Sequence, residues 1–296
     1  MSSDFWIILT ACLMSAACGL LGCFLILRKM ALIGDAISHA VLPGIAIAFL
    51  LSGTRDSLAM MIGATALGLL AVFLIQWLQN SGIQSDASIG IIFTALFAIG
   101  VIIISLNARN IDLDLDCVLF GEIAYVQWDT WTANGIDMGP RSVWMLGSAL
   151  LIILLLLALF YKQFKISAFD PAMAVACGIP VMLFHYLLMG MVSMTSVASF
   201  ESVGAILVVG MLIIPASTAY LLTDRLGRML MYSVLTGVVS SIIGYYTAYV
   251  LNASIAGSIV TVAGILFGIA FVFSPKHGVL IRRLRQRRSQ GTAIAE

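Results

Sequence analysis

The sequence has few charged residues. Of 296 residues, 10% are Asp, Glu, Lys or Arg and 61% are hydrophobic, and the mean hydropathy is +1.10. Soluble domains are about one quarter charged. Because long apolar runs fill nearly the whole chain, no room is left for a separate water-soluble catalytic domain, and a net charge of +1 indicates no nucleic-acid partner. The composition is that of an integral membrane protein.

Sequence motifs for several chemistries are also missing. No Gly-Lys dipeptide occurs, so the chain has no P-loop for ATP. No Glu follows a His, which excludes the H-E-x-x-H helix of zinc proteases. The serines between positions 193 and 202 have no G-x-S-x-G motif or paired base, so we expect them to hydrogen-bond within the membrane. The five cysteines form no C-x-x-C pair, and those of the first apolar run are expected to be small buried residues.

What the sequence does contain is a series of apolar runs. A helix needs about 20 apolar residues to cross a bilayer. On this rule the sequence predicts an all-α polytopic protein with about nine membrane-spanning helices, eight if the chain turns back between the sixth and seventh runs. The runs are 5–27, 31–51, 58–79, 88–106, 143–161, 180–199, 202–222, 229–250 and 254–273. The first is expected to be a span and no cleaved signal, because Arg28 and Lys29 follow it.

The basic residues predict the orientation of these spans, because cytoplasmic connections retain Lys and Arg. One alternating set of connections contains 12 of the 15 basic residues and includes the tail 281–296. The other set contains only Arg55, Arg109 and Arg141 together with most of the acids. We therefore expect the N-terminus outside and the C-terminus inside, with one membrane domain over residues 1–280 and a basic cytoplasmic tail that contacts anionic lipid.

The longest polar connection, residues 107–142, is expected to lie outside. Its DLDLD stretch (112–116) has acids at every second position, as a calcium loop begins. The glycine at the sixth position and the glutamate at the twelfth position of such a loop are missing, so the match fails. A solvated acidic surface is the expectation for this segment.

Asp35 and His39 are the ionisable pair inside the second run. Positions four residues apart share one face of a helix, so both side chains can reach one point. A carboxylate and an imidazole suit manganese, iron or zinc. Pro43 and Gly44 are expected to weaken or kink the helix one turn later. From these residues alone, a metal site and a simple pairing of the two side chains remain equally open.

Two other ionisable residues fall within predicted spans. His185 enters the sixth span at a depth close to that of His39, so it can join the pair or make a packing hydrogen bond. Glu201 is expected near the outer end of the seventh span, either as an entry carboxylate or as a cap at that helix's N-terminus. Pro215 is expected to bend the seventh span.

Five blocks, spread over nearly the whole sequence, carry a family resemblance: LRKMALIGDAISHAVLPGIAIAFLL (27–51), ASIGIIFTALFAIGVIIIS (87–105), LDLDCVLFGEIAYV (113–126), SFESVGAILVVGMLIIPASTAYLLTDRL (199–226) and FSPKHGVL (273–280). In these blocks the sequence resembles the bacterial ABC-importer permeases that move manganese, zinc or iron. The segment NGIDMGPRSVW (134–144) is more similar to the manganese/iron branch than to the shorter zinc permeases.

This resemblance implies a transport subunit without its own ATPase site, active as a dimer of identical or related permeases in the bacterial cytoplasmic membrane. An extracytoplasmic binding protein would deliver manganese, iron or zinc, and two ATPase subunits would dock from inside. No permanently bound cofactor is implied. The metal ligands carried over are Asp35 and His39, with His185 and Glu201 as further candidates. The alternatives are a permease for a vitamin or chelated iron, and an ion-coupled secondary metal transporter.

The family also needs a cytoplasmic coupling helix, and residues 168–178 suit one. Asp170 can be the N-cap, Pro171 fits the first helical position, Gly178 suits the C-terminal cap, and Pro180 follows where a helix should stop. A short apolar face around Met173 is expected to contact the ATPase. An ordinary interfacial turn is the alternative for this segment.

Overall fold

The structure, a computed structural model, is almost entirely helical. It describes residues 3–40, 42–52, 57–106, 123–133 and 136–274. The elements in chain order are α1 (Ser3–Leu27), α2 (Ala31–Ala40), α3 (Leu42–Ser52), α4 (Ser57–Asn80), α5 (Ser85–Leu106), η1 (Ile123–Tyr125), β1 (Thr130–Ala133), β2 (Ile136–Pro140), α7 (Arg141–Leu159), α8 (Tyr161–Phe169), α9 (Pro171–Ala176), α10 (Val181–Val203), α11 (Ala205–Leu222), α12 (Leu226–Leu251) and α13 (Ile255–Phe273).

Within the described residues, eight helices are long and apolar enough to cross a membrane: α1, α4, α5, α7 and α10–α13. The second predicted run, 31–51, is described as two helices of 10 and 11 residues, α2 and α3, on either side of residue 41. The prediction of an all-helical membrane fold is confirmed, and the count is eight continuous spans. Residue 41, between these two helices, lies outside the described part of the structure, and the sequence predicts a weakening or kink close by, at Pro43 and Gly44.

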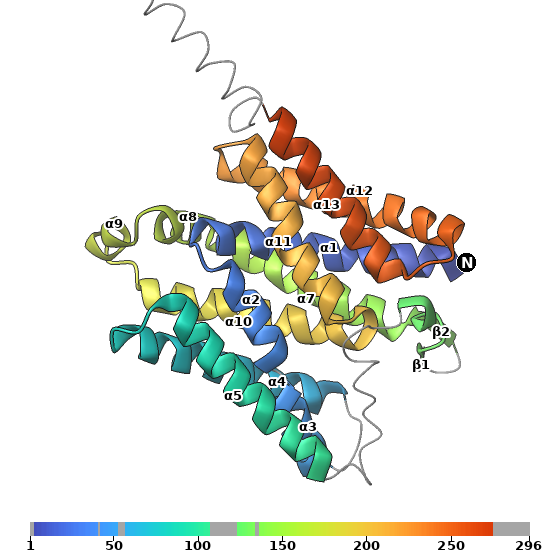
Figure 1. Cartoon of the computed structure of the whole chain (residues 1–296), viewed down its shortest axis with the longest axis horizontal. Coiled ribbons are helices and arrows are strands. Elements are labelled where there is room, and N and C mark those ends of the chain that lie inside the picture. The colour runs from blue at the N-terminus through green and yellow to red at the C-terminus, as the bar shows by residue number, and fades with distance from the viewer. Residues whose placement is uncertain (1–2, 41, 53–56, 107–122, 134–135, 275–296) are drawn as a thin grey trace, which may run out of the picture.

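Helix α1 is the centre of the bundle. It packs against α7, α10, α11 and α12, and most of its residues are buried. Helices α3, α4 and α5 form a second group (Figure 1), and α2 runs between this group and α10 and α11. The ionisable pair of α2 is thus carried by a short helix held on several sides by longer ones.

Small residues let the central helices approach closely. A side chain on Gly22 of α1 would overlap the backbone carbonyl of Leu212 in α11. On the α12 side, the Oγ of Ser233 donates to the Gly19 carbonyl at 2.9 Å. Because lipid provides no hydrophobic driving force between helices, such close packing and interhelical hydrogen bonds hold a membrane bundle together.

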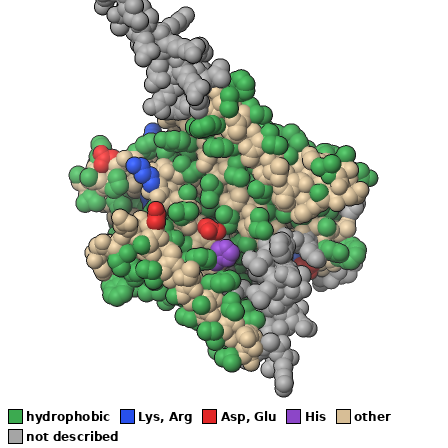
Figure 2. Space-filling model, viewed as in Figure 1, with side chains coloured by type: hydrophobic (Ala, Val, Ile, Leu, Met, Phe, Trp, Pro, Cys, Tyr) green, Lys and Arg blue, Asp and Glu red, His purple; other side chains and the backbone are tan. Residues whose placement is uncertain are grey.

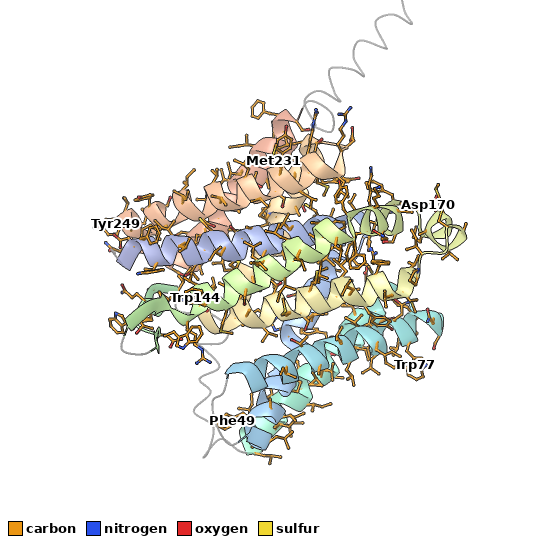
Figure 3. All side chains as sticks on the ribbon, turned by 180° about the vertical axis from the view of Figure 1, so that it is seen from behind. Phe49, Trp77, Trp144, Asp170, Met231 and Tyr249 are labelled. Atoms are coloured by element: carbon orange, nitrogen blue, oxygen red, sulfur yellow. The ribbon has the colours of Figure 1, made fainter. Side chains whose placement is uncertain are left out.

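The ends of the molecule carry different elements. Helix α9 lies at one end, and β1, β2 and the N-terminus lie at the other (Figure 1). From behind, Trp77 of α4 lies toward the end that carries Asp170, opposite Trp144 and Tyr249 (Figure 3). Helices α2 and α3 together therefore bring the chain from the α9 end of the bundle back to the hairpin end.

The described residues contain one β-sheet, a two-stranded antiparallel hairpin that was not predicted from the sequence. Strand β1 pairs with β2 from Thr130 opposite Pro140 to Ala133 opposite Ile136, with an irregularity after Thr130. It occupies part of the connection 107–142. The DLDLD stretch and the basic tail 281–296 lie outside the described residues.

Candidate functional site

The candidate site begins with Asp35 and His39 on α2. The His39 Nε2 lies 3.6 Å from the Asp35 Oδ1, one helical turn away. The Asp35 side chain is 43% exposed and the His39 side chain is 26% exposed. Figure 2 shows an acidic patch beside a histidine patch on a face that is otherwise largely apolar. The structure brings the predicted pair together and leaves it accessible.

The opposite side of α2 explains this orientation. Ile33, Ile37 and Ala40 are buried, with at most 2% exposure each. Gly34 faces Leu212 of α11, so closely that a side chain at position 34 would overlap the leucine. Burial of the apolar face against α10, α4 and α11 turns the face that carries the two ionisable side chains outward from the protomer.

Two aromatic rings of α5 flank His39. Its imidazole centroid is 5.2 Å from that of Phe93 and 5.8 Å from that of Phe97, the second in an edge-to-face arrangement. These contacts come from a helix about 55 residues further along the chain. Neither phenylalanine was predicted as part of the site, because the sequence of an apolar span does not indicate which of its aromatic residues will contact a histidine.

His185 lies in the first turns of α10 and is 8% exposed. Its neighbours are the Tyr186 ring, at a centroid distance of 5.5 Å, and the positively charged Arg28. Among the described residues no three His, Cys, Asp or Glu side chains gather closely enough to hold a metal ion. The structure therefore does not bring His185 to Asp35 and His39 within one chain. A neighbouring guanidinium also opposes cation binding there.

Glu201 belongs to the last turn of α10, and α11 begins only after Gly204. Glu201 therefore lies at the end of the sixth span and not at the start of the seventh, and Gly204, with φ of 83°, occupies the N-cap position of α11. The glutamate side chain lies outside the described part of the structure. Pro215 is inside α11, as expected.

The predicted coupling segment folds as its caps require. Asp170 accepts a hydrogen bond from the Met173 backbone N–H at 3.0 Å, and Pro171 occupies the first helical position. Gly178 has φ of 75° directly after the C-cap residue Cys177. The N–H groups of Gly178 and Ile179 donate back to Val175 and Ala174, which is a Schellman ending.

The six-residue helix α9 leaves apolar side chains uncovered. Met173 is 57% exposed and Val175 is 64% exposed, whereas Ala174 is fully buried. Helix α9 lies at the end of the molecule opposite the hairpin (Figure 1). The segment thus has the short apolar face that the sequence predicted, and that face is free to contact another protein.

Eight long apolar helices in one bundle, with an accessible acid–histidine pair among the described residues, define a multi-pass membrane protein. Residues 4–274 match the ABC 3 transport family, and the chain belongs to that family.

Curated relatives cover nearly the whole chain. It is 53% identical to the manganese transport system membrane protein MntD of Bacillus subtilis over 96% of this chain and 97% of that protein. It is 44% identical to the zinc transport system membrane protein TroD of Treponema pallidum, over 95% and 77% of the two chains. A probable iron transport system membrane protein of Haemophilus influenzae is 35% identical over 90% of this chain and 88% of that protein.

Solved structures agree with the fold. The chain superposes on PsaBC from Streptococcus pneumoniae, solved in complex with Fab, with a TM-score of 0.80 and 38% identity, covering 97% of this chain and 96% of that one. An inward-facing metal-chelate type ABC transporter matches with a TM-score of 0.61 at 17% identity, which shows the shared fold alone. The family resemblance found in the sequence is confirmed, and so is its greater similarity to manganese transport proteins.

Proposed function

We propose that the chain is the permease subunit of an ATP-driven importer of divalent transition metal ions, with manganese as the first candidate and iron or zinc after it. The observation that carries this proposal is the Asp35–His39 pair on an accessible face of α2. An ionisable pair within a membrane bundle is costly and marks a substrate path by default. Relatives named for manganese, zinc and iron transport support the choice of cargo.

The chemistry of the pair suits a transported ion. Carboxylate oxygen and imidazole nitrogen together favour transition metals, whereas magnesium and calcium prefer oxygen ligands alone. A transport site must bind strongly enough to accept an ion and weakly enough to release it. Two ligands from one chain would release an ion readily but would bind it only weakly. Further ligands are therefore needed to complete the site.

A second permease chain, identical or related, would complete it. The pair lies on a face of the protomer that would otherwise meet lipid, where a carboxylate is costly. A two-fold related copy with the same face would cover both side chains and add its own carboxylate and imidazole. Four ligands, two from each chain, would then surround one ion between the protomers.

The energy would come from separate ATPase subunits docking at α9. The exposed Met173 and Val175 are suited to an apolar groove, and the Schellman ending holds the short helix in shape without a partner. With α9 inside, the hairpin and the N-terminus face outward, where an extracytoplasmic protein would deliver the ion. This orientation agrees with the distribution of Lys and Arg.

Uptake by the reconstituted complex tests the proposal. Asp35→Ala, His39→Ala and the double variant should each assemble with the ATPase and fail to import Mn²⁺. Two matched controls are available in the same chain: Asp86→Ala, in the exposed first turn of α5, and His185→Gln, in buried α10. Both should leave the metal preference unchanged.

Three outcomes would contradict the proposal. Normal metal uptake by all three site variants would show that the pair is not the ion site. Uptake that proceeds without ATP or an ATPase partner would indicate an ion-coupled secondary carrier. ATP-dependent uptake of a vitamin or an iron chelate, unaffected by the loss of Asp35 and His39, would indicate a permease of the other cargo class.

A further inference from the structure

The His39 imidazole lies against an aromatic wall on α5. Phe93 and Phe97 stand one helical turn apart, with their own centroids 6.3 Å from each other. The imidazole plane is tilted 54° to the Phe93 ring and 89° to the Phe97 ring. Both phenylalanines are partly exposed, and each also packs against buried apolar residues.

Two such contacts limit how the imidazole can turn. The torsion between Cβ and the ring of a histidine is broad and roughly two-fold, so an uncontacted ring samples several directions. Tilted and edge-to-face aromatic contacts are favourable beyond their buried area. With two rings on one side, the contacts hold the plane of the imidazole. A half-turn about the same torsion keeps both contacts, and of these two orientations the observed one leaves Nε2 near the Asp35 carboxylate.

We propose that Phe93 and Phe97 are positioning residues for the ion site, which fix the His39 imidazole so that its nitrogen and the Asp35 carboxylate approach one ion together. This inference rests on the proposed function. Its consequence is selectivity: a fixed imidazole makes nitrogen an obligatory ligand, which transition metals accept and Ca²⁺ and Mg²⁺ do not favour. A freely turning imidazole would leave the carboxylate to bind ions of either kind.

The chain contains a matched pair of rings with no histidine. Phe267 and Phe271 on α13 are also four residues apart, with centroids 6.2 Å from each other. Their planes are nearly parallel, at 22°, and they contact each other within one membrane span. Substitutions at this second pair change the same residue types in the same setting and leave His39 untouched.

The experiment compares the double variant Phe93→Leu/Phe97→Leu with Phe267→Leu/Phe271→Leu in the full complex reconstituted into vesicles. Initial Mn²⁺ uptake is measured against Mn²⁺ concentration, with and without excess Ca²⁺. For the α5 variant we expect KM to rise about tenfold at nearly constant maximal rate, because two favourable aromatic contacts are lost. We also expect Ca²⁺ to compete more strongly. The α13 variant should match the parent protein. Phe93→Tyr and Phe97→Tyr keep the rings and should restore the parental KM.

Pulsed EPR of Mn²⁺ bound to the purified complex gives a second readout. Nitrogen hyperfine coupling from an imidazole ligand should be present in the parent and in the α13 variant, and weakened in the α5 variant. If the double leucine variant does not assemble, the single variants decide, since each removes one ring and each should raise KM.

The outcomes separate this inference from the proposed function. If His39→Ala abolishes uptake while the α5 variants keep the parental KM, Ca²⁺ competition and nitrogen coupling, the positioning role is wrong and the proposed function stands. If the α5 variants lower the maximal rate without changing KM, the rings serve helix packing and the inference is also wrong. If His39→Ala transports Mn²⁺ normally, the proposed site itself fails.

Discussion

The Arg28 guanidinium donates a hydrogen bond from Nη2 to the Ser167 Oγ at 2.8 Å. This contact joins the end of α1 to α8, the helix that leads into α9. Directly after Arg28, Lys29 adopts φ of 57°, and α2 begins two residues later. This one side-chain contact thus connects the turn before α2, the helix of Asp35 and His39, to α8, the helix before α9.

This contact leads to a prediction for Ser167→Ala. The Arg28 Nε is buried without a hydrogen-bond partner, and burial lowers the pKa of this guanidinium. Removal of the serine hydroxyl leaves the buried cation with one bond fewer, which should cost about 1–3 kcal/mol of unfolding free energy. Thermal unfolding of the detergent-solubilised protein measures it. Ser148→Ala is the control, because the Ser148 hydroxyl is exposed and bonds only its own helix. Equal melting temperatures for the two variants would contradict the prediction.

A second prediction concerns the contact of α1 with α11. In Gly22→Ala, the added methyl group would overlap the Leu212 carbonyl, and backbone cannot yield as a side chain can. We expect a loss of about 1–3 kcal/mol from overpacking and a corresponding fall in melting temperature. Gly264→Ala on α13 is the matched control, since no atom lies within 4 Å of the added group. A Gly22→Ala variant as stable as Gly264→Ala would show that the two helices can separate at no cost.

The sequence predicted best what depends on residues close together in the chain. The Asp35–His39 pair follows from a spacing of four, and α9 follows from Asp170, Pro171 and Gly178 acting on their own turn. The eight long spans follow from apolar length alone.

Contacts between distant segments could not be predicted in this way. Phe93 and Phe97 reach His39 only because α5 packs against α2. His185 lies on α10 beside Arg28, and among the described residues it forms no cluster with Asp35 and His39. Depth along a helix can be counted from the sequence, whereas the direction in which a side chain points is set by tertiary packing.

The N-cap of α9 gives a third prediction. Asp170→Ala removes the acceptor of the Met173 N–H and should destabilise the short helix by about 1 kcal/mol. Asp170→Asn keeps an acceptor and should behave like the parent. If α9 couples to the ATPase, the alanine variant should show reduced Mn²⁺-stimulated ATP hydrolysis, with Mn²⁺ binding to the purified protein unchanged. Identical ATPase stimulation in the alanine and asparagine variants would mean that the cap does not matter for coupling.

A native cysteine allows the orientation and the docking surface to be tested together. Cys177 ends α9 and is exposed, whereas Cys18 and Cys23 are buried in α1. In a Cys117→Ser background, a membrane-impermeant maleimide should label Cys177 in inside-out vesicles and leave it unlabelled in right-side-out ones, because α9 is expected on the cytoplasmic side. Bound ATPase subunits should slow the labelling of inside-out vesicles about tenfold or more, since covering the thiol blocks reagent access. Labelling from the outer face would reverse the proposed orientation. Unchanged labelling in the presence of the ATPase would mean that the docking surface lies elsewhere than the exposed face of Met173 and Val175.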